Sequence, residues 1–600
     1  MVEISCRSYL FLVLQKKSNV NNGFFLPPPH EMGGPAKFTN WREGQDKFCS
    51  DIIDCTKRFS IHNMSVGGGK SLGAMVAAIA TGKRVAYLTE SRSLQDQVAA
   101  DFTECGLFDM RGLQNYTCRA LAEGGFLEQL WMKRWGRPTC DVGPCASGLR
   151  CDLKNAGCDY FDAWRFANNA QLVLTNYAYW IAIHKYGNGL GKFDMLICDE
   201  CHAAGDQLSN ALSVEFATKD FKELGTEPLK VTAPLQNWRM WARVNLLKVQ
   251  SRLEFFAAGA RIGQTVDERG VLILVQDTDL PDASELRLWK RLEGKCQMVS
   301  ESNDDWIVEQ DENSGHIRMA PAFVSKYTEG ALFLGIPRVV MMSGTVRPKT
   351  ADLNGIAESE REFIEYPSTF PVENRPIYWL PTVRLNAKSS QEDLRTWVVR
   401  IDQILARRLD RKGIIHTKSY ARQQYLLAHS RFRDIMHANT QSNTRDVVKT
   451  FRAASAPAVL VSPSVGTGFD FAHSQARFQI IGKVPFYDPR GSVMKAQMKQ
   501  DPDYLNYLTS QDLIQLYGRS NRAPDDFSET FITDDNVSWF IKQYSGYAFD
   551  EKMGRFNMNI KLNKPASKCF FPYYFLEAFQ RIGSVMDPPR LESMKVAGSM

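Results

Sequence analysis

Residues 64–71 read Met-Ser-Val-Gly-Gly-Gly-Lys-Ser, and this stretch constrains the fold of the chain more than any other. Consecutive glycines can form a tight turn whose backbone N–H groups point at a phosphate chain, because no side chain blocks the approach. In such a turn Lys70 reaches the β- and γ-phosphates, and the Ser71 hydroxyl binds Mg²⁺. The stretch therefore predicts a nucleotide phosphate loop, whose glycines are Gly67, Gly68 and Gly69.

The residues after this loop support that prediction. Residues 72–80 are apolar apart from one glycine, and they end at Thr81 and Gly82, a pattern typical of a buried helix with a stop signal. A helix that begins at the loop adds its positive N-terminal end to the anion site. Met64 is a departure, because the first glycine of the usual phosphate loop falls at that position. The alternative interpretation is a glycine-rich turn that binds no ligand.

A second motif joins an apolar strand to two adjacent carboxylates. Residues 193–198 read Phe-Asp-Met-Leu-Ile-Cys, and the next four residues are Asp199, Glu200, Cys201 and His202. Such a strand end suits the Walker B site of a nucleotide hydrolase. Asp199 would hold Mg²⁺, and Glu200 would orient and deprotonate the attacking water. An Asp-Glu pair that caps a helix is the alternative.

Cysteines are concentrated between these two motifs. The chain has 13 cysteines, and five of them lie in one short region, at Cys118, Cys140, Cys145, Cys151 and Cys158. Their spacing is wider than the Cys-x-x-Cys of zinc ribbons, and the pattern favours a metal site over a secreted disulfide framework. Four thiolates drawn from loops are what a [4Fe–4S] cluster requires. Zinc, or a site that has lost its metal, is the alternative.

The C-terminal half contains a second set of strand-like segments. Apolar runs lead into small polar residues, as in the ligand-contacting loops of α/β proteins, at 413–417, 458–462 and 478–486. Farther on, residues 515–522 read Gln-Leu-Tyr-Gly-Arg-Ser-Asn-Arg and place Arg519 and Arg522 on one face of an expected helix. Arginines so placed can neutralise charge on a γ-phosphate bound by another domain.

Length and composition set broad limits. A chain of 600 residues is too long for one core, so we expect about three or four domains or inserts. The net charge of +6 permits a basic channel for nucleic acid but does not require one. No segment reaches membrane-spanning length, and the short apolar run at 9–14 is followed by Gln-Lys-Lys instead of a cleavage site. We therefore expect a cytoplasmic protein, in a bacterial cell or a phage-infected host.

The order in which the motifs occur resembles that of a known protein family. The series runs Arg42-x-x-Gln45, the glycine loop, the cysteine region, Asp-Glu-Cys-His, Ser-Gly-Thr at 343–345, and Gln-x-x-Gly-Arg-x-x-Arg. It resembles superfamily 2 helicases of the DEAD/DEAH-box type, and the cysteine insert is similar to that of the DinG/XPD-like iron–sulfur branch. The resemblance covers residues 38–540. Phage-encoded and CRISPR-associated DinG-like helicases are the nearest relatives that we expect.

This resemblance implies an α/β fold with two RecA-like domains, in which parallel sheets are flanked by helices. The first domain would carry an iron–sulfur insert and a helical arch-like insert. The implied segments are an N-terminal extension at 1–37, a first RecA-like domain at 38–110, 165–205 and 326–350, an iron–sulfur domain at 111–164, an arch-like insert at 206–325, and a second RecA-like domain with a C-terminal tail at 351–600.

The resemblance also implies a role for individual residues. Gln45, with Arg42 in the same motif, would bind the adenine of ATP, and the loop glycines, Lys70 and Ser71 would hold its phosphates. Asp199 and Glu200 would serve Mg²⁺ and water. Residues implied to close over ATP or to couple hydrolysis to movement are His202, Ser343, Thr345, Gly468, Asp470, Gln515, Arg519 and Arg522. The implied ligands of a [4Fe–4S] cluster are Cys118, Cys145, Cys151 and Cys158, with Cys140 as a competing ligand.

The activity implied is an ATP-dependent DNA helicase that moves 5′ to 3′ on single-stranded DNA. ATP, Mg²⁺ and the cluster are its implied cofactors. Its implied partners are single-stranded DNA, a DNA duplex or RNA–DNA hybrid, and a nucleoprotein complex; we expect a monomer and no membrane partner. Three positions depart from the family pattern: Met64, Cys201 in place of the commoner Ala, and Thr467, where relatives often carry Glu. The Thr467 change bears on helicase coupling more than on ATP turnover.

Two alternatives stay open. A DinG-like ATP-dependent nuclease would need an added carboxylate cluster in a separate domain, and the extension at 1–37 is too short to hold one. A partner-dependent remodeller would bind ATP and DNA without unwinding duplexes on its own.

Overall fold

The fold is described here from a computed structural model. It covers residues 26–122, 138–143, 145–147, 151–155, 157–259, 263–266, 272–275, 283–311, 314–466, 469–521 and 525–589. The predicted strand run at 9–14 lies outside these residues. No helix in the described ranges is both long and apolar enough to cross a membrane.

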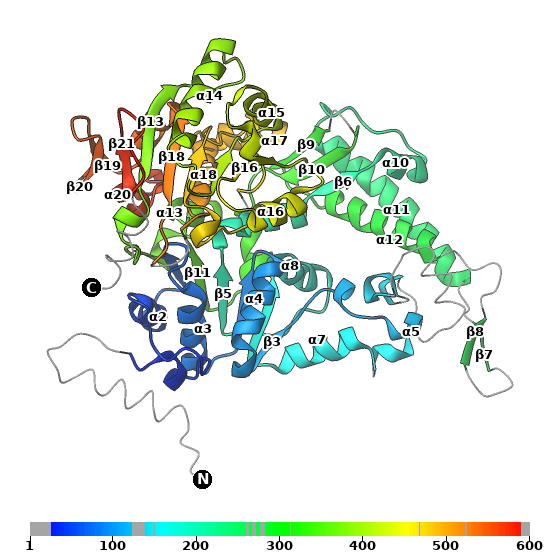
Figure 1. Ribbon diagram of the computed structural model, residues 1–600. Coiled ribbons are helices and arrows are strands. Elements are labelled where there is room, and N and C mark those ends of the chain that lie inside the picture. Colours follow the sequence, from blue (N-terminus) through cyan, green and yellow to red (C-terminus); the bar gives the residue numbers. More distant parts are fainter. Residues whose placement is uncertain are drawn as a thin grey trace, which may run out of the picture.

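A seven-stranded parallel sheet forms the core of the first domain (Figure 1). Its strand order is β12-β1-β11-β5-β2-β4-β3. The strands are β1 (Phe59–Asn63), β2 (Val85–Thr89), β3 (Leu107–Asp109), β4 (Leu172–Asn176), β5 (Met195–Asp199), β11 (Arg338–Ser343) and β12 (Arg361–Glu365). The central strands β1, β2 and β5 are buried along their whole length, as expected where helices cover both faces of a parallel sheet.

Helices of the first domain begin close to the carboxyl ends of these strands. They are α2 (Gln45–Asp54), α3 (Lys70–Thr81), α4 (Arg92–Phe102), α7 (Asp159–Asn169), α8 (Tyr177–Tyr186), α9 (Ala204–Leu212) and α13 (Pro348–Leu353). The predicted stop signal of α3 is Gly82, which has φ 61°, a left-handed conformation that glycine adopts without steric cost. The carboxyl ends of the strands therefore form one edge, where the loops of the motifs gather.

A nine-stranded sheet forms the second domain, with the order β15-β16-β14-β17-β18-β13-β21-β20-β19. The strands are β13 (Ile377–Val383), β14 (Gly413–His416), β15 (Met436–Ala438), β16 (Val459–Ser462), β17 (Phe478–Ile481), β18 (Glu529–Asp534), β19 (Tyr547–Asp550), β20 (Arg555–Lys561) and β21 (Phe579–Arg581). Strands β19 and β20 add an antiparallel hairpin at one end of an otherwise parallel sheet.

The second sheet is also flanked by helices (Figure 1). These are α14 (Gln391–Leu405), α15 (Tyr420–His429), α16 (Thr444–Ala453), α17 (Ser492–Gln500), α18 (Tyr504–Tyr517), α19 (Asn536–Tyr544) and α20 (Tyr573–Ala578). The α/β fold with two RecA-like domains, predicted from the sequence, is confirmed. The expected boundary at residue 350 leaves β12 with the second domain, whereas β12 pairs with β1 of the first sheet.

Two segments are inserted into the first domain. Between β3 and β4 lies the cysteine region, with short turns of 3-10 helix at Cys140–Val142, Cys145–Ser147 and Asp152–Lys154 and the helix α5 (Arg119–Ala122). Between α9 and β11 lies a lobe formed by β6 (Val214–Phe216), α10 (Thr218–Leu224), α11 (Leu235–Gly259), β7 (Gly263–Val266), β8 (Leu272–Val275), α12 (Ala283–Ser300), β9 (Trp306–Gln310) and β10 (Ile317–Pro321). In Figure 1, α11 and α12 run side by side through this lobe, which contains a three-stranded sheet as well as helices.

The chain passes from the first sheet to the second through residues 366–376. The Tyr366 hydroxyl donates to Asp51 of α2 at 2.8 Å, which attaches the start of this linker to the first domain. At the other end Arg375 is buried and donates to the carbonyl of Phe370 at 2.9 Å and that of Tyr574 at 2.5 Å. The linker is therefore held to one domain at each end.

Candidate active site

Glycine conformation shapes the loop that precedes α3. Gly67 and Gly69 have φ of 81° and 78°, which L side chains rarely adopt. A Cβ built on Gly69 would lie 1.8 Å from Nε2 of Gln45. The same Nε2 donates to the Gly69 carbonyl at 3.0 Å, and Nη1 of Arg42 donates to the Gly67 carbonyl at 3.2 Å. Glycine at 69 therefore lets the Arg-x-x-Gln motif dock directly on the loop.

Lys70 is the first residue of α3, and its side chain is turned back over the loop. The residue is 8% exposed, and its Nζ donates to the Met64 carbonyl at 3.3 Å. Met64 is itself buried in the core of the first domain, and its side chain packs against the loop, because a Cβ on Gly68 would lie 3.0 Å from Met64 Cγ. The residue that departs from the family pattern thus contributes a backbone carbonyl that holds the lysine.

Asp199 ends β5 close to Lys70, and two tyrosines hold it. The Tyr87 hydroxyl of β2 donates to Oδ2 of Asp199 at 2.9 Å, and the Tyr177 hydroxyl donates to its backbone carbonyl at 2.9 Å. Tyr87 also hydrogen-bonds Ser71. Burial, with the Glu200 charge, raises the pKa of Asp199 to about 7, although Lys70 and Tyr87 oppose the rise. Asp199 is therefore placed beside Ser71 in a site that favours a compensating cation.

Glu200 occupies a strained backbone position, with φ 45° and ψ 47°. Its Oε2 accepts a hydrogen bond from the Ser343 hydroxyl at 2.8 Å and lies 3.3 Å from Nδ1 of His202. Burial alone would raise the Glu200 pKa, but the Lys70 ammonium and the bonds from His202 and Ser343 lower it. The Glu200 carboxylate therefore stays ionised, as a proton acceptor must.

A hydrogen-bonded path leads from this glutamate into the second domain. Nδ1 of His202 lies 2.8 Å from the Ser343 hydroxyl, and Nε2 of His202 lies 2.5 Å from Nε2 of Gln515 in α18. Thr345 lies next to the path, because its N–H donates to the Ser343 hydroxyl at 3.2 Å. Burial by itself would lower the pKa of His202, but the Glu200 and Glu90 carboxylates raise it. The structure thus brings together side chains from three places that are far apart in the sequence, at 200–202, 343 and 515.

Of the remaining second-domain candidates, the structure describes Arg519 and Asp470. Arg519 donates to the carbonyls of Gly466 and Phe469 at 2.8 and 3.1 Å and pairs with Asp470 at 3.2 Å, all within its own domain. A Cβ on Gly518 would lie 3.2 Å from Val66, so the end of α18 approaches the glycine loop of the first domain. Arg522, Thr467 and Gly468 lie outside the described residues.

The cysteines of the inserted region lie close together. Cys140 shares thiol hydrogen bonds with Cys118 and Cys158. The bond between Cys118 and Cys140 lowers the pKa of the Cys118 thiol to about 7 and raises that of Cys140. Cys145 interacts electrostatically with Cys118, Cys151 and Cys158. All five predicted candidates are therefore neighbours, and Cys140 is as central as the four preferred ligands.

The clustered cysteines can be examined as ligands of an iron–sulfur cluster or a metal ion. Within the described ranges, no three Cys, His, Asp or Glu side chains are placed so that they could hold one metal ion. Gly143 packs closely against this group, because a Cβ at that position would lie 2.8 Å from Sγ of Cys118. The described cysteines are therefore near one another, but their side chains do not form a metal site.

Two tyrosines of the site are hardly indicated by the sequence. Tyr87 and Tyr177 were not singled out, because a tyrosine in a buried strand or helix is an ordinary core residue. Only the partners of their hydroxyls distinguish them. For Tyr87 a weak signal exists, since a polar tip in the middle of an apolar strand needs a hydrogen-bond partner.

Comparisons with known proteins agree with this geometry. Residues 38–233 match the family model "Type III restriction enzyme, res subunit", and residues 405–548 match "Helicase C-terminal domain". Among solved structures, one named "XPD_Helicase" has a TM-score of 0.54 and 14% identity, covering 84% of this chain and 98% of the other. Xpd4 from S. tokodaii has a TM-score of 0.50 and 14% identity, with 83% and 97% covered. No curated protein matches the chain.

These matches agree on the fold and on a helicase-type C-terminal domain. The two family models match the two halves of the motif series, and the chain shares with the XPD-named structures a fold of two RecA-like domains. The resemblance to DinG/XPD-like superfamily 2 helicases is thereby confirmed, and the findings support a helicase-type ATPase.

Proposed function

We propose that the protein is an ATP-dependent DNA helicase that moves 5′ to 3′ on single-stranded DNA and unwinds duplexes. One observation carries this proposal, namely the hydrogen-bonded path from Glu200 to Gln515. It joins the side chain best placed to activate water to a helix of the opposite domain. A path of this kind is what a motor needs, since hydrolysis must change the relation between its domains.

ATP would bind between the two domains, with its phosphates on the glycine loop and its γ-phosphate near Lys70. Ser71 and Asp199 would hold Mg²⁺, which supplies positive charge against the phosphate oxygens. Glu200 would accept a proton from the attacking water while the water oxygen bonds to the γ-phosphorus. The bond to the bridging β–γ oxygen breaks, and ADP and phosphate leave. Lys70 would stabilise the charge that develops on the phosphate oxygens.

Movement would follow from the change in charge at Glu200. When Glu200 accepts the proton, its attraction for the Ser343 hydroxyl and the His202 ring would weaken, which would loosen the first-domain end of the path to Gln515. Closing and reopening of the domains would then draw single-stranded DNA along a groove held by phosphate contacts. The cysteine domain at 111–164 and the arch-like insert at 206–325 would enclose the strand. Their contact supports this, because Arg287 of α12 hydrogen-bonds the Val142 carbonyl.

Strand displacement tests the proposal. Anaerobically purified protein with ATP and Mg²⁺ is expected to unwind a duplex that carries a 5′ single-stranded tail and to leave a 3′-tailed duplex intact. The measurement is release of a fluorescently labelled strand over time. Unwinding of only the 3′-tailed duplex would contradict the polarity. DNA-stimulated ATP hydrolysis without any unwinding would favour the partner-dependent remodeller instead.

We further propose that the clustered cysteines hold a [4Fe–4S] cluster, which would supply a rigid link among the loops of this region. The observation in support is the contact of their thiols, including Cys140. Anaerobic protein is expected to contain about four iron and four sulfide per chain. Comparing Cys140→Ser with Cys145→Ser identifies the fourth ligand, since only loss of a true ligand should lower the iron content. Zinc in place of iron would contradict the proposal.

The Tyr87 hydroxyl is expected to position the proposed Mg²⁺ ligands. Tyr87→Phe removes its bonds to Asp199 and Ser71, and we expect a roughly tenfold higher Mg²⁺ concentration for half-maximal binding of a fluorescent ADP analogue. Tyr177→Phe is the matched control, because the Tyr177 hydroxyl bonds the backbone carbonyl of Asp199 and the Cys198 thiol but neither proposed Mg²⁺ ligand side chain. An equal effect of both variants would show that Tyr87 acts through packing alone.

A further inference from the structure

Helix α18 of the second domain contacts the first domain near its end and also near its beginning. Near its end, Gln515 contacts His202, as described above. Near its beginning, the Tyr507 hydroxyl shares a hydrogen bond of 2.6 Å with the hydroxyl of Thr350 in α13. The positions of Tyr507 and Gln515 are about 12 Å apart along the helix axis, because an α-helix rises about 1.5 Å per residue. The proposed ATP chemistry uses the contact of Gln515 and leaves that of Tyr507 without a role.

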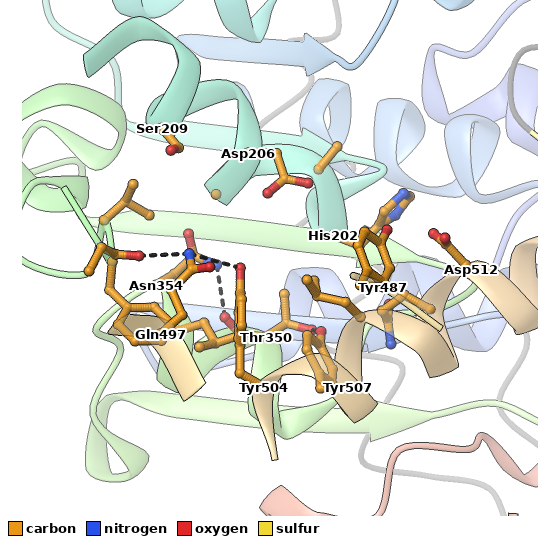
Figure 2. Close-up of a pocket in the computed structure, with 18 of the residues that line it drawn as sticks. His202, Asp206, Ser209, Thr350, Asn354, Tyr487, Gln497, Tyr504, Tyr507 and Asp512 are labelled. Carbon is orange, nitrogen blue, oxygen red and sulfur yellow. Dashed lines mark hydrogen bonds between the residues drawn. The ribbon is translucent and has the colours of Figure 1, made fainter. Parts of the chain in front are cut away.

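The two hydroxyls are buried at the boundary between the domains. Thr350 and Tyr507 are each 3% exposed, and both line a cavity of about 270 Å³ that also reaches His202 (Figure 2). Thr350 is the one hydrogen-bond partner that the described residues provide for the Tyr507 hydroxyl. A buried hydroxyl without a partner is costly, so this bond favours the arrangement of the domains in which the two residues meet.

Thr350 is joined through its backbone to the loop that contacts the proposed proton acceptor. The Arg347 N–H donates to Oγ1 of Thr350 at 3.0 Å, which caps the beginning of α13. Four residues earlier, the Ser343 hydroxyl donates to Glu200 at 2.8 Å. The loop between these residues is fixed, because Nδ2 of Asn63 donates to two of its carbonyls, at 3.0 and 2.8 Å. One loop therefore connects the neighbour of Glu200 to the residue that holds α18.

Further contacts of α13 and its N-cap residue support the same attachment. Nζ of Lys349 lies 2.5 Å from the Asp501 carboxylate, just before α18, and these side chains are 15% and 18% exposed. Burial of this degree limits screening of the pair by solvent. Nε of Arg347 donates to the Cys569 carbonyl of the second domain at 3.0 Å. Helix α13 is therefore the first-domain element against which the beginning of α18 is positioned.

We propose that Tyr507 is a positioning residue for ATP hydrolysis, because its bond to Thr350 holds α18 where Gln515 contacts His202. This role rests on the proposed function, since it acts on hydrolysis through Gln515. Without the bond, the beginning of α18 is free to shift, and Gln515 spends less time on His202. The His202 ring then orients Glu200 less often for the attack of water. Binding of ATP is not affected, because neither hydroxyl belongs to the glycine loop.

Steady-state ATP hydrolysis by the full chain tests this role. Tyr507→Phe removes the hydroxyl and keeps the ring, which packs edge-to-face on Phe570. We expect kcat to fall about fivefold and KM for ATP to change less than about twofold. Tyr544→Phe is the matched control, because its ring stacks on the same Phe570 and its hydroxyl bonds Asp503 and Asn506 within the second domain. Its kcat is expected to be unchanged, and melting temperatures show that both variants fold.

Variants of the partner residue separate the bond from packing. Thr350→Ser keeps a hydroxyl at the same place and is expected to keep the normal kcat. Thr350→Val keeps the shape of the side chain without the hydroxyl, so its kcat is expected to fall as in Tyr507→Phe. Equal rates in the serine and valine variants would show that only packing matters at this position and would overturn the proposal.

A double variant tests whether Tyr507 acts through Gln515. If it does, Tyr507→Phe added to Gln515→Ala lowers kcat little further, whereas independent effects multiply. Multiplied effects, or a normal kcat in Tyr507→Phe alone, would overturn the positioning role and leave the proposed function standing. Absence of hydrolysis in the unaltered protein would instead contradict the proposed function.

Amide hydrogen exchange of the free protein at residues 504–517 tests the contact without catalysis. Faster exchange in Tyr507→Phe than in Tyr544→Phe is expected, because only the first variant loses a bond between the domains. Equal exchange in the two variants would overturn the proposal whether or not the protein hydrolyses ATP.

Discussion

Replacing Lys70 with alanine is expected to reduce ATP hydrolysis by roughly 10²–10³-fold, the range found when one positioned charge-stabilising donor is removed. The lysine side chain is buried over the glycine loop and lowers the pKa of the Glu200 carboxylate, so its ammonium acts at the centre of the site. Phosphate release at saturating Mg²⁺ and DNA is the measurement. Strand displacement is expected to disappear in parallel.

The control for this variant is Lys83→Ala. Lys83 is exposed just beyond the end of α3, so its loss changes the charge of the protein by the same amount without touching the loop. Its hydrolysis rate is expected to match that of the unaltered protein. Should Lys70→Ala hydrolyse ATP at the normal rate while remaining folded, the glycine loop would not be the phosphate site.

Replacing Glu200 with glutamine is expected to separate nucleotide binding from hydrolysis. Glutamine keeps the size of the side chain and an oxygen that can accept the Ser343 bond, but it cannot take a proton from water. We expect hydrolysis to fall by roughly 10²–10⁴-fold, the usual contribution of a general base. The affinity for a fluorescent ATP analogue should change little, because the glycine loop is intact.

Single-turnover hydrolysis and equilibrium binding on the same preparation measure both effects. Glu223→Gln is the control, since Glu223 is an exposed carboxylate in the inserted lobe. A variant that lost binding and hydrolysis together would show that Glu200 supports the loop instead of activating water. A normal hydrolysis rate would mean that another group accepts the proton.

Motifs that are contiguous in the sequence could be predicted well. The glycine loop and the Asp-Glu pair each follow an apolar run, and an apolar run that ends in small or charged residues is enough to indicate a strand leading into a ligand loop. The parallel sheets and the two RecA-like domains followed from the order of these motifs. The predicted functions of the individual side chains are still predictions.

Long-range contacts could not be predicted in this way. His202 and Gln515 are 313 residues apart, and nothing in either motif states that their side chains meet. The Tyr87 hydroxyl, which contacts Asp199 112 residues away, depends on the pairing of β2 with β5. Periodicity reports which face of an element is buried, but not what lies opposite that face.

The linker at 366–376 limits how the two domains can move relative to each other. Tyr366 is hydrogen-bonded to the first domain. Arg375 is hydrogen-bonded to the second domain and also to the Phe370 carbonyl. Freedom of rotation is thereby left mainly to the few bonds between residues 367 and 370. A turn of one half against the other would therefore bend the chain at this short stretch, beside the contacts in which the Tyr573 N–H donates to Glu365 and the Tyr574 hydroxyl donates to the Gly344 carbonyl.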